Sequence, residues 1–164
     1  MISGAAGTGL FFLYMARETG FPRARELARA AGEGLLALAE EASAGAEGER
    51  SLRWRMAPGY ERWMPNFSHG TAGVAFFLAS LHADLTWAGV ATDGRFLDAA
   101  LAGARTLTAL ADTRDGGALV MHHAPGGEEL FYLGWCHGPV GTTRLWRALE
   151  SATGSSSRSS RPSG

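Results

Sequence analysis

One cysteine and two histidines are the side chains best placed for chemistry in this sequence. Cys136 and His137 lie in the string Trp-Cys-His-Gly directly before an apolar run, and His69 lies in Ser-His-Gly before another. The start of a helix carries partial positive charge, which favours a thiolate and lowers the pKa of a cysteine below about 8.5. Cys136 could therefore bind zinc or act as a nucleophile. The alternatives are an inert buried cysteine and, for His69, a structural residue held by hydrogen bonds.

Both motifs belong to a pattern that occurs three times. Gly4-Ala-Ala-Gly7, Gly70-Thr-Ala-Gly73 and Gly138-Pro-Val-Gly141 are 66 and 68 residues apart, and each opens an apolar run typical of a helix. The string Ala-Pro-Gly, at 57–59 and 124–126, keeps a similar period of 67 residues. Repetition at this distance indicates stacked supersecondary units. Equivalent helix ends of a closed array face a shared axis, so we expect His69 and the Cys136-His137 pair to converge.

Two kinds of helical sequence alternate between these landmarks. Nearly uniform apolar runs, typical of helices buried on most sides, are followed by amphipathic runs with one face on protein and one in water. The alternation predicts an all-α fold of about three α/α hairpins in two concentric layers, the third without its amphipathic partner. The expected apolar helices cover 9–16, 74–85 and 142–150, and the amphipathic helices cover 23–42 and 96–110, the latter with Thr92-Asp93 as its N-cap.

The segments between hairpins are expected to be short β-hairpin flaps. Proline followed by glycine suits a type II turn, and the flanking residues are aromatic or β-branched enough for short strands. His122 and His123 lie on the second flap, where adjacent side chains point to opposite faces. At most one of them is therefore expected to reach the site. The expected strand pairs are 52–56 with 61–64 and 118–122 with 128–133.

Composition excludes several classes of protein. The chain has 164 residues, 46% of them hydrophobic, and a net charge of −1, which fits one globular domain and argues against a disordered chain or a nucleic-acid-binding protein. All 15 basic residues are arginine, so lysine chemistry such as a Schiff base or a P-loop is excluded. A single cysteine allows no internal disulfide and suits a reducing compartment. Without a secretory signal or a membrane-spanning run of about 20 apolar residues, we expect a cytoplasmic protein.

The repeated openings, Ser68-His69-Gly70-Thr-Ala-Gly73 and Gly134-Trp-Cys-His-Gly-Pro-Val-Gly141 resemble the lanthionine synthetase C-like family. The resemblance covers residues 1 to about 150 and implies a partial α/α toroid, because the family forms a ring of seven hairpins. Residues 151–164 are rich in Ser, Gly and Arg and are expected to be a disordered tail. We therefore expect a portion of a longer array.

The resemblance also implies an activity. Family cyclases hold zinc with two cysteines and one histidine, leaving one position for a substrate cysteine, whose thiolate adds to a dehydroamino acid to form a thioether. By this resemblance Cys136 is a zinc ligand and His69 is the acid/base group. The expected substrates are a dehydrated peptide or a small thiol, with no nucleic acid and no membrane span, and open toroid edges allow association.

The chain departs from the family pattern at several positions. The second zinc pair, a further Cys-His-Gly, is missing, so we expect zinc-dependent activity in the parent enzyme and an inactive chain here. His137 and Tyr132 replace a tyrosine and an arginine of the peptide cyclases, a form closer to the branch that joins glutathione or other thiols to dehydroamino acids.

Two other functions remain open from the residues alone. One is a non-catalytic α/α scaffold that binds a peptide or protein on its concave face. The other is an α/α-barrel acting on carbohydrate, which requires an opposed pair of carboxylates. Asp84 and the pair Glu128-Glu129 are the candidates, and solvated charge is their simpler interpretation.

Overall fold

Both kinds of helical sequence form helices in the structure, a computed structural model that describes residues 4–21, 23–44, 48–114 and 116–154. The all-α prediction is confirmed, with one two-stranded antiparallel sheet added to the described helices. The elements are α1 (Ala5–Thr19), α2 (Ala24–Ala37), β1 (Glu40–Glu41), β2 (Leu52–Arg53), α3 (Thr71–Trp87), α4 (Arg95–Leu110) and α5 (Pro139–Thr153).

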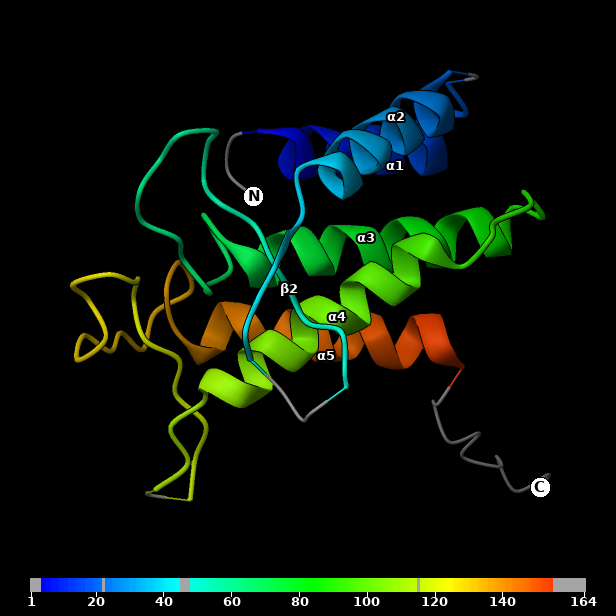
Figure 1. Ribbon diagram of the computed structural model, residues 1–164. Helices are drawn as coiled ribbons and strands as arrows, with labels where there is room; N and C mark the ends of the chain where they lie inside the picture. The colour runs from blue at the N-terminus through cyan, green and yellow to red at the C-terminus, as the bar shows by residue number, and fades with distance from the viewer. Residues whose placement is uncertain (1–3, 22, 45–47, 115, 155–164) are drawn as a thin grey trace, which may run out of the picture.

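Helices α1, α3 and α5 form a row, and α2 and α4 pack outside it (Figure 1). The prediction that the helices of this row are buried on most sides is wrong for α1 and α5, which each bury one face. Helix α3 lies between α1 and α5, and its side chains are buried on nearly all sides. Helices α1 and α2 form one antiparallel hairpin, and α3 and α4 form the next. The described chain thus consists of two hairpins and a fifth helix, arranged in two layers.

A buried carboxylate joins the first hairpin to the second. Asp84 of α3 is fully buried and accepts hydrogen bonds from Arg17 Nε of α1 (2.8 Å) and Arg25 Nε of α2 (2.9 Å). A carboxylate removed from water needs such charged donors. Asp84 therefore has a structural role.

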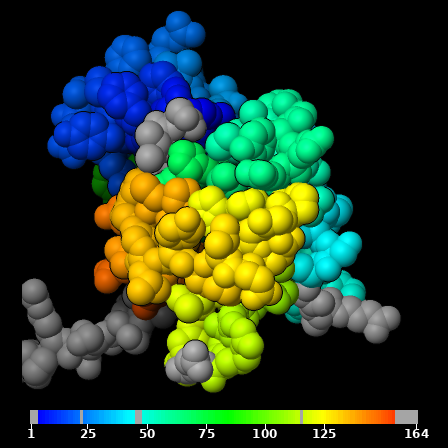
Figure 2. All heavy atoms as spheres, turned by 90° about the vertical axis from the view of Figure 1, so that its left-hand side faces the viewer, coloured from blue at the N-terminus to red at the C-terminus, as the bar shows by residue number. Residues whose placement is uncertain are grey.

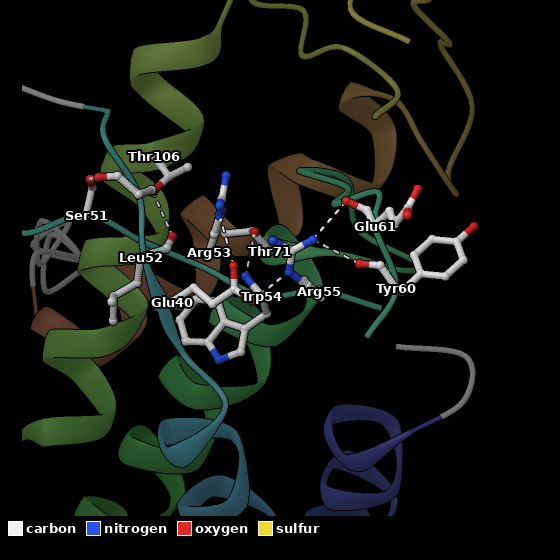
Figure 3. A network of polar contacts seen from close by, with 11 residues as sticks. Glu40, Ser51, Leu52, Arg53, Trp54, Arg55, Tyr60, Glu61, Thr71 and Thr106 are labelled. Atoms are coloured by element: carbon white, nitrogen blue, oxygen red, sulfur yellow. Dashed lines mark hydrogen bonds and ion pairs between the residues drawn. The ribbon is translucent and has the colours of Figure 1, made fainter. Parts of the chain in front are cut away.

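The segment after α2 is held to the helices by polar contacts of buried groups (Figure 3). Thr106 Oγ1 of α4 donates to the carbonyl of Leu52 (2.7 Å), and the Trp54 indole donates to the carbonyl of Leu35 (2.7 Å). Glu40 accepts from Arg53 and Arg55, at 3.3 and 2.6 Å.

The predicted β-hairpin flaps form single contacts in place of ladders. Arg55 forms one bridge with Trp63 in the first flap, and the N–H of His122 donates to the carbonyl of Leu130 (2.7 Å) in the second, each within its expected strand pair. Residues 52–53 form their ladder with Glu40–Glu41 instead, and α2 ends at Ala37 and not at 42. Arg53 and Arg55 both reach Glu40 across this pairing. One bridge, between Trp63 and Ala124, joins the two flaps to each other.

The last helix is longer than the sequence indicates. Helix α5 runs from Pro139 to Thr153 and ends at Gly154, whose φ of 68° is the left-handed conformation that glycine favours. The expected tail boundary at 151 thus falls inside the helix, and positions 155–164 lie outside the described residues. Within the described chain, no helix combines the length and apolar character needed to cross a membrane.

Candidate functional site

Helices α1, α3 and α5 all begin on the same side of the molecule, on the left in Figure 1. Figure 2 faces this side and shows residues 120–133 (yellow) next to residues 55–65 (green-cyan) and the loop that precedes α5 (orange). The flaps are joined by two backbone hydrogen bonds between Trp63 and Ala124, at 2.9 and 3.0 Å. The candidate motifs therefore share one surface.

The glycine after each motif histidine allows the chain to fold back closely before the helix. A Cβ on Gly70 would lie 1.7 Å from the carbonyl oxygen of Met64, and one on Gly138 would lie 2.2 Å from that of Tyr132. The same Met64 oxygen accepts the N–H of Thr71 (2.9 Å) at the start of α3. The repeated glycine is thus explained by a close backbone approach, six residues upstream in both copies.

The loops that carry the two motifs are in direct contact. The backbone N–H of Ser68 donates to the carbonyl oxygen of Cys136 (3.0 Å), and the rings of Phe67 and Trp135 meet edge to face with centroids 5.3 Å apart. The predicted convergence of equivalent motif positions is therefore observed for these two loops.

Three imidazole rings gather where the loops meet. The ring centroid of His137 lies 5.5 Å from that of His69 and 4.3 Å from that of His122, and the Tyr132 ring lies 4.9 Å from His122. We call His69, His122 and His137 the histidine cluster. All three side chains are half-buried, so each remains partly accessible to solvent.

His122 is fixed in this cluster by its neighbours. Its carbonyl accepts from Nδ2 of the buried Asn66 (2.9 Å), and its N–H donates to the carbonyl of Leu130 (2.7 Å). Its Nδ1 lies 2.7 Å from Nδ1 of His123, which is buried with 6% exposure. Of the two adjacent histidines only His122 is in ring contact with His137, but the His123 ring lies against that of His122, so the two side chains do not point to opposite faces as predicted.

The cluster favours neutral imidazoles. Burial lowers the pKa of His69, His122 and His137, and the positive charge of His137 lowers the pKa of His69 and His122 further. A neutral imidazole has one nitrogen with a free lone pair. Each ring can thus accept a proton or bind a metal at neutral pH.

The zinc site implied by the resemblance would have Cys136 as a ligand. Cys136 is a half-buried free thiol, and thiolate and imidazole are zinc ligands by type. No three His, Cys, Asp or Glu side chains of residues 4–21, 23–44, 48–114 and 116–154, however, are placed to hold a metal ion together. The role of Cys136 as a zinc ligand and the catalytic role of His69 stay predictions.

A cavity of about 600 Å³ opens beside His69. Its walls come from the start of α1, the end of α2 and residues 54–59, and most of the lining is apolar. The ion-paired Glu40 and Arg55 contribute charge to the wall. This volume is within the range of small-molecule and peptide side-chain sites.

The candidate carboxylate pair for carbohydrate chemistry does not form. Asp84 is engaged by Arg17 and Arg25, and a Glu128 carboxylate oxygen accepts the N–H of Gly126 (2.8 Å) within its own turn. The group that sequence reasoning missed at the site is Asn66, and for His123, which it named on the flap, it missed the contact with His122. The available signal for Asn66 was its polar side chain, three positions before His69.

Comparison of the chain with family models, with curated proteins and with solved structures gives no match in any of the three.

Proposed function

We propose that this chain is a portion of a lanthionine synthetase C-like enzyme, whose parent activity is zinc-dependent addition of a cysteine thiol to a dehydroamino acid. The observation that supports the proposal is the contact between the loops before α3 and α5. It brings His69 against His137, next in sequence to Cys136. The row of α1, α3 and α5 with α2 and α4 outside it then corresponds to part of an α/α toroid, and we place the protein in the cytoplasm.

The addition requires two proton transfers, which a neutral imidazole can perform. The thiol loses its proton, sulfur attacks Cβ of the dehydroamino acid, and Cα takes up a proton, so the S–H group adds across the double bond without oxidation or reduction. His69, with its lowered pKa, takes the thiol proton and returns a proton to Cα. A zinc ion, when bound, would lower the pKa of the substrate thiol.

Cys136 would hold that zinc only together with ligands beyond those described, so this chain by itself is expected to be inactive in the zinc-dependent reaction. The cavity beside His69 would receive the peptide or small thiol. On α5, Val140 and Trp146 are 60% and 42% exposed and would pack against the next hairpin of the ring.

The acid/base part of the proposal can be tested without turnover. Cys136 is the only cysteine of the chain. In metal-free buffer its thiol should attack a peptide that contains dehydroalanine and binds beside His69. We expect a covalent adduct at Cys136, detected by mass spectrometry, that forms faster than the adduct with free glutathione. His69→Ala should slow the reaction by about 10²-fold or more, the range for a positioned acid/base group.

His82→Ala serves as the matched control, because His82 lies on α3 outside the cluster. Alkylation by iodoacetamide reports whether a variant changes the accessibility of the thiol. Equal adduct rates in the His69 and His82 variants, or a wild-type rate no faster than that of glutathione, would contradict the proposal. Peptide binding without adduct formation would favour the non-catalytic scaffold.

A further inference from the structure

His122 and His137 form a close imidazole pair from two separate segments. His122 belongs to the second flap and His137 to the loop before α5, and their ring centroids are 4.3 Å apart with planes tilted by 44°. Both rings are half-buried, and within the described chain the ring of His137 makes no hydrogen bond to protein. The pair therefore keeps lone pairs available to a ligand.

The tautomers of His122 and His123 are linked. The two Nδ1 atoms are 2.7 Å apart, a distance at which one must carry the hydrogen, because two facing lone pairs repel. When His122 Nδ1–H donates to His123, His122 Nε2 keeps the free lone pair. Metal-binding histidines almost always donate their other ring N–H to a fixed partner in this way, and the partner orients the ring.

The turn of the second flap leaves room for the His123 ring next to His122. A Cβ on Gly127 would lie 2.3 Å from both Cε1 and Nδ1 of the His123 ring, so only glycine leaves room for the buried imidazole. On its other side, the flap is tied to the loop of His69 through Asn66 and the carbonyl of His122. The pair is thus held by both the flap turn and the first motif loop.

We propose that His122 and His137 form a two-imidazole site for a divalent transition-metal ion, with water completing the coordination. Neutral imidazole suits Zn²⁺, Co²⁺, Ni²⁺ and Cu²⁺. Two imidazoles on one tetrahedral ion, with metal–nitrogen bonds of about 2.0–2.1 Å, have ring centroids about 5 Å apart. The observed 4.3 Å thus requires only a small rotation of half-exposed rings.

This site is separate from the zinc ligation expected of Cys136, and it does not depend on the proposed thiol addition. It uses two protein ligands, in keeping with the finding that no three metal-ligand side chains of the described residues converge. Its affinity is therefore below that of a structural zinc site with four ligands. A metal held there would have open positions next to the His69 ring.

The test is a titration of the full chain with Co²⁺, followed by visible absorption and by competition with Zn²⁺. We expect one ion per chain, with no thiolate-to-cobalt band in the near ultraviolet. His122→Ala and His137→Ala should each weaken binding by at least about tenfold, and His123→Ala by about 10- to 100-fold, the range for outer-shell partners. His82→Ala and Cys136→Ser should leave the affinity unchanged.

Loss of binding in Cys136→Ser together with a thiolate band in the wild type would overturn the site and assign the ion to Cys136. Unchanged affinity in His122→Ala, or no binding by the wild type, would also overturn it. Helical circular dichroism identifies any variant that does not fold, and His122→Gln and His137→Gln then replace it. The adduct assay is run without metal, so its failure would overturn the thiol chemistry and leave this site standing.

Discussion

At the scale of single residues, the cluster combines partial burial with mutual proximity of three groups that can become positive. A charge on one ring disfavours a charge on the next, and burial disfavours charge on all of them. A neutral imidazole in such a place is available as a base or as a ligand. The same arrangement must make folding sensitive to pH.

The free energy of unfolding should fall as the pH is lowered past the ordinary histidine pKa of 6.5. The pKa values of His69, His122 and His137 are lowered in the folded state, so the unfolded chain binds more protons below pH 6.5. The stability they contribute is complete above that value and is lost as the pH falls through the lowered pKa values.

Urea unfolding from pH 7.5 to 5 measures this dependence. The variant His137→Gln should show a shallower loss than the wild type, since it removes one proton site and one repelling charge. His82→Gln provides the control for losing a histidine elsewhere. Equal slopes for wild type and His137→Gln would show that the cluster does not titrate as described.

At the scale of elements, periodicity predicted every described helix, and tertiary contacts determined where several of them end. The alternation of apolar and amphipathic runs predicts burial correctly for α3, whereas α1 and α5 each bury only one face and α4 is more buried than either. The pairing that follows α2 could not be predicted, because in it Glu40 meets Arg53 and Arg55 from a later segment. Such pairing carries no local signal.

The site was predictable to the extent that it follows the repeat. The spacing indicated that the loop of His69 would meet that of Cys136 and His137, and the Ser68 hydrogen bond shows that it does. The contribution of Asn66 and His123 arises from the way the second flap folds over the first loop. That contact lies between non-helical segments without periodicity, so sequence could not reveal it.

The contact between α1 and α3 depends on a glycine. A Cβ on Gly9 would lie 2.2 Å from Cζ of the fully buried Phe77 ring. Gly9→Ala should therefore lower the free energy of unfolding by about 1–3 kcal/mol, the usual cost of overfilling a core. Denaturant unfolding followed by circular dichroism measures the change.

Gly34 in α2 is the matched control, because a Cβ there meets open space. Gly34→Ala should raise stability by about 0.5–1 kcal/mol through the gain in helix propensity. If both substitutions moved stability in the same direction, the close packing of α1 on α3 would be contradicted.

At the scale of the whole molecule, the account depends on how the repeat units are arranged. The inner helices start on one side, and the loops before α3 and α5 cover that side together with the flaps (Figures 1 and 2). A chain folded with the same helices in another order would keep the helix content and the buried apolar surface. It would separate His69, His122 and His137, and with them both the proposed acid/base group and the metal pair.

The most direct test of this arrangement is a nuclear Overhauser spectrum of the imidazole protons in the full chain. The ring centroids of His137 lie 4.3 Å from His122 and 5.5 Å from His69, so cross-peaks between the His137 ring and each of the others are predicted. His137→Ala should remove both sets of peaks and so confirm their assignment. Cross-peaks from each ring only to its own sequence neighbours would contradict the convergence of the motifs.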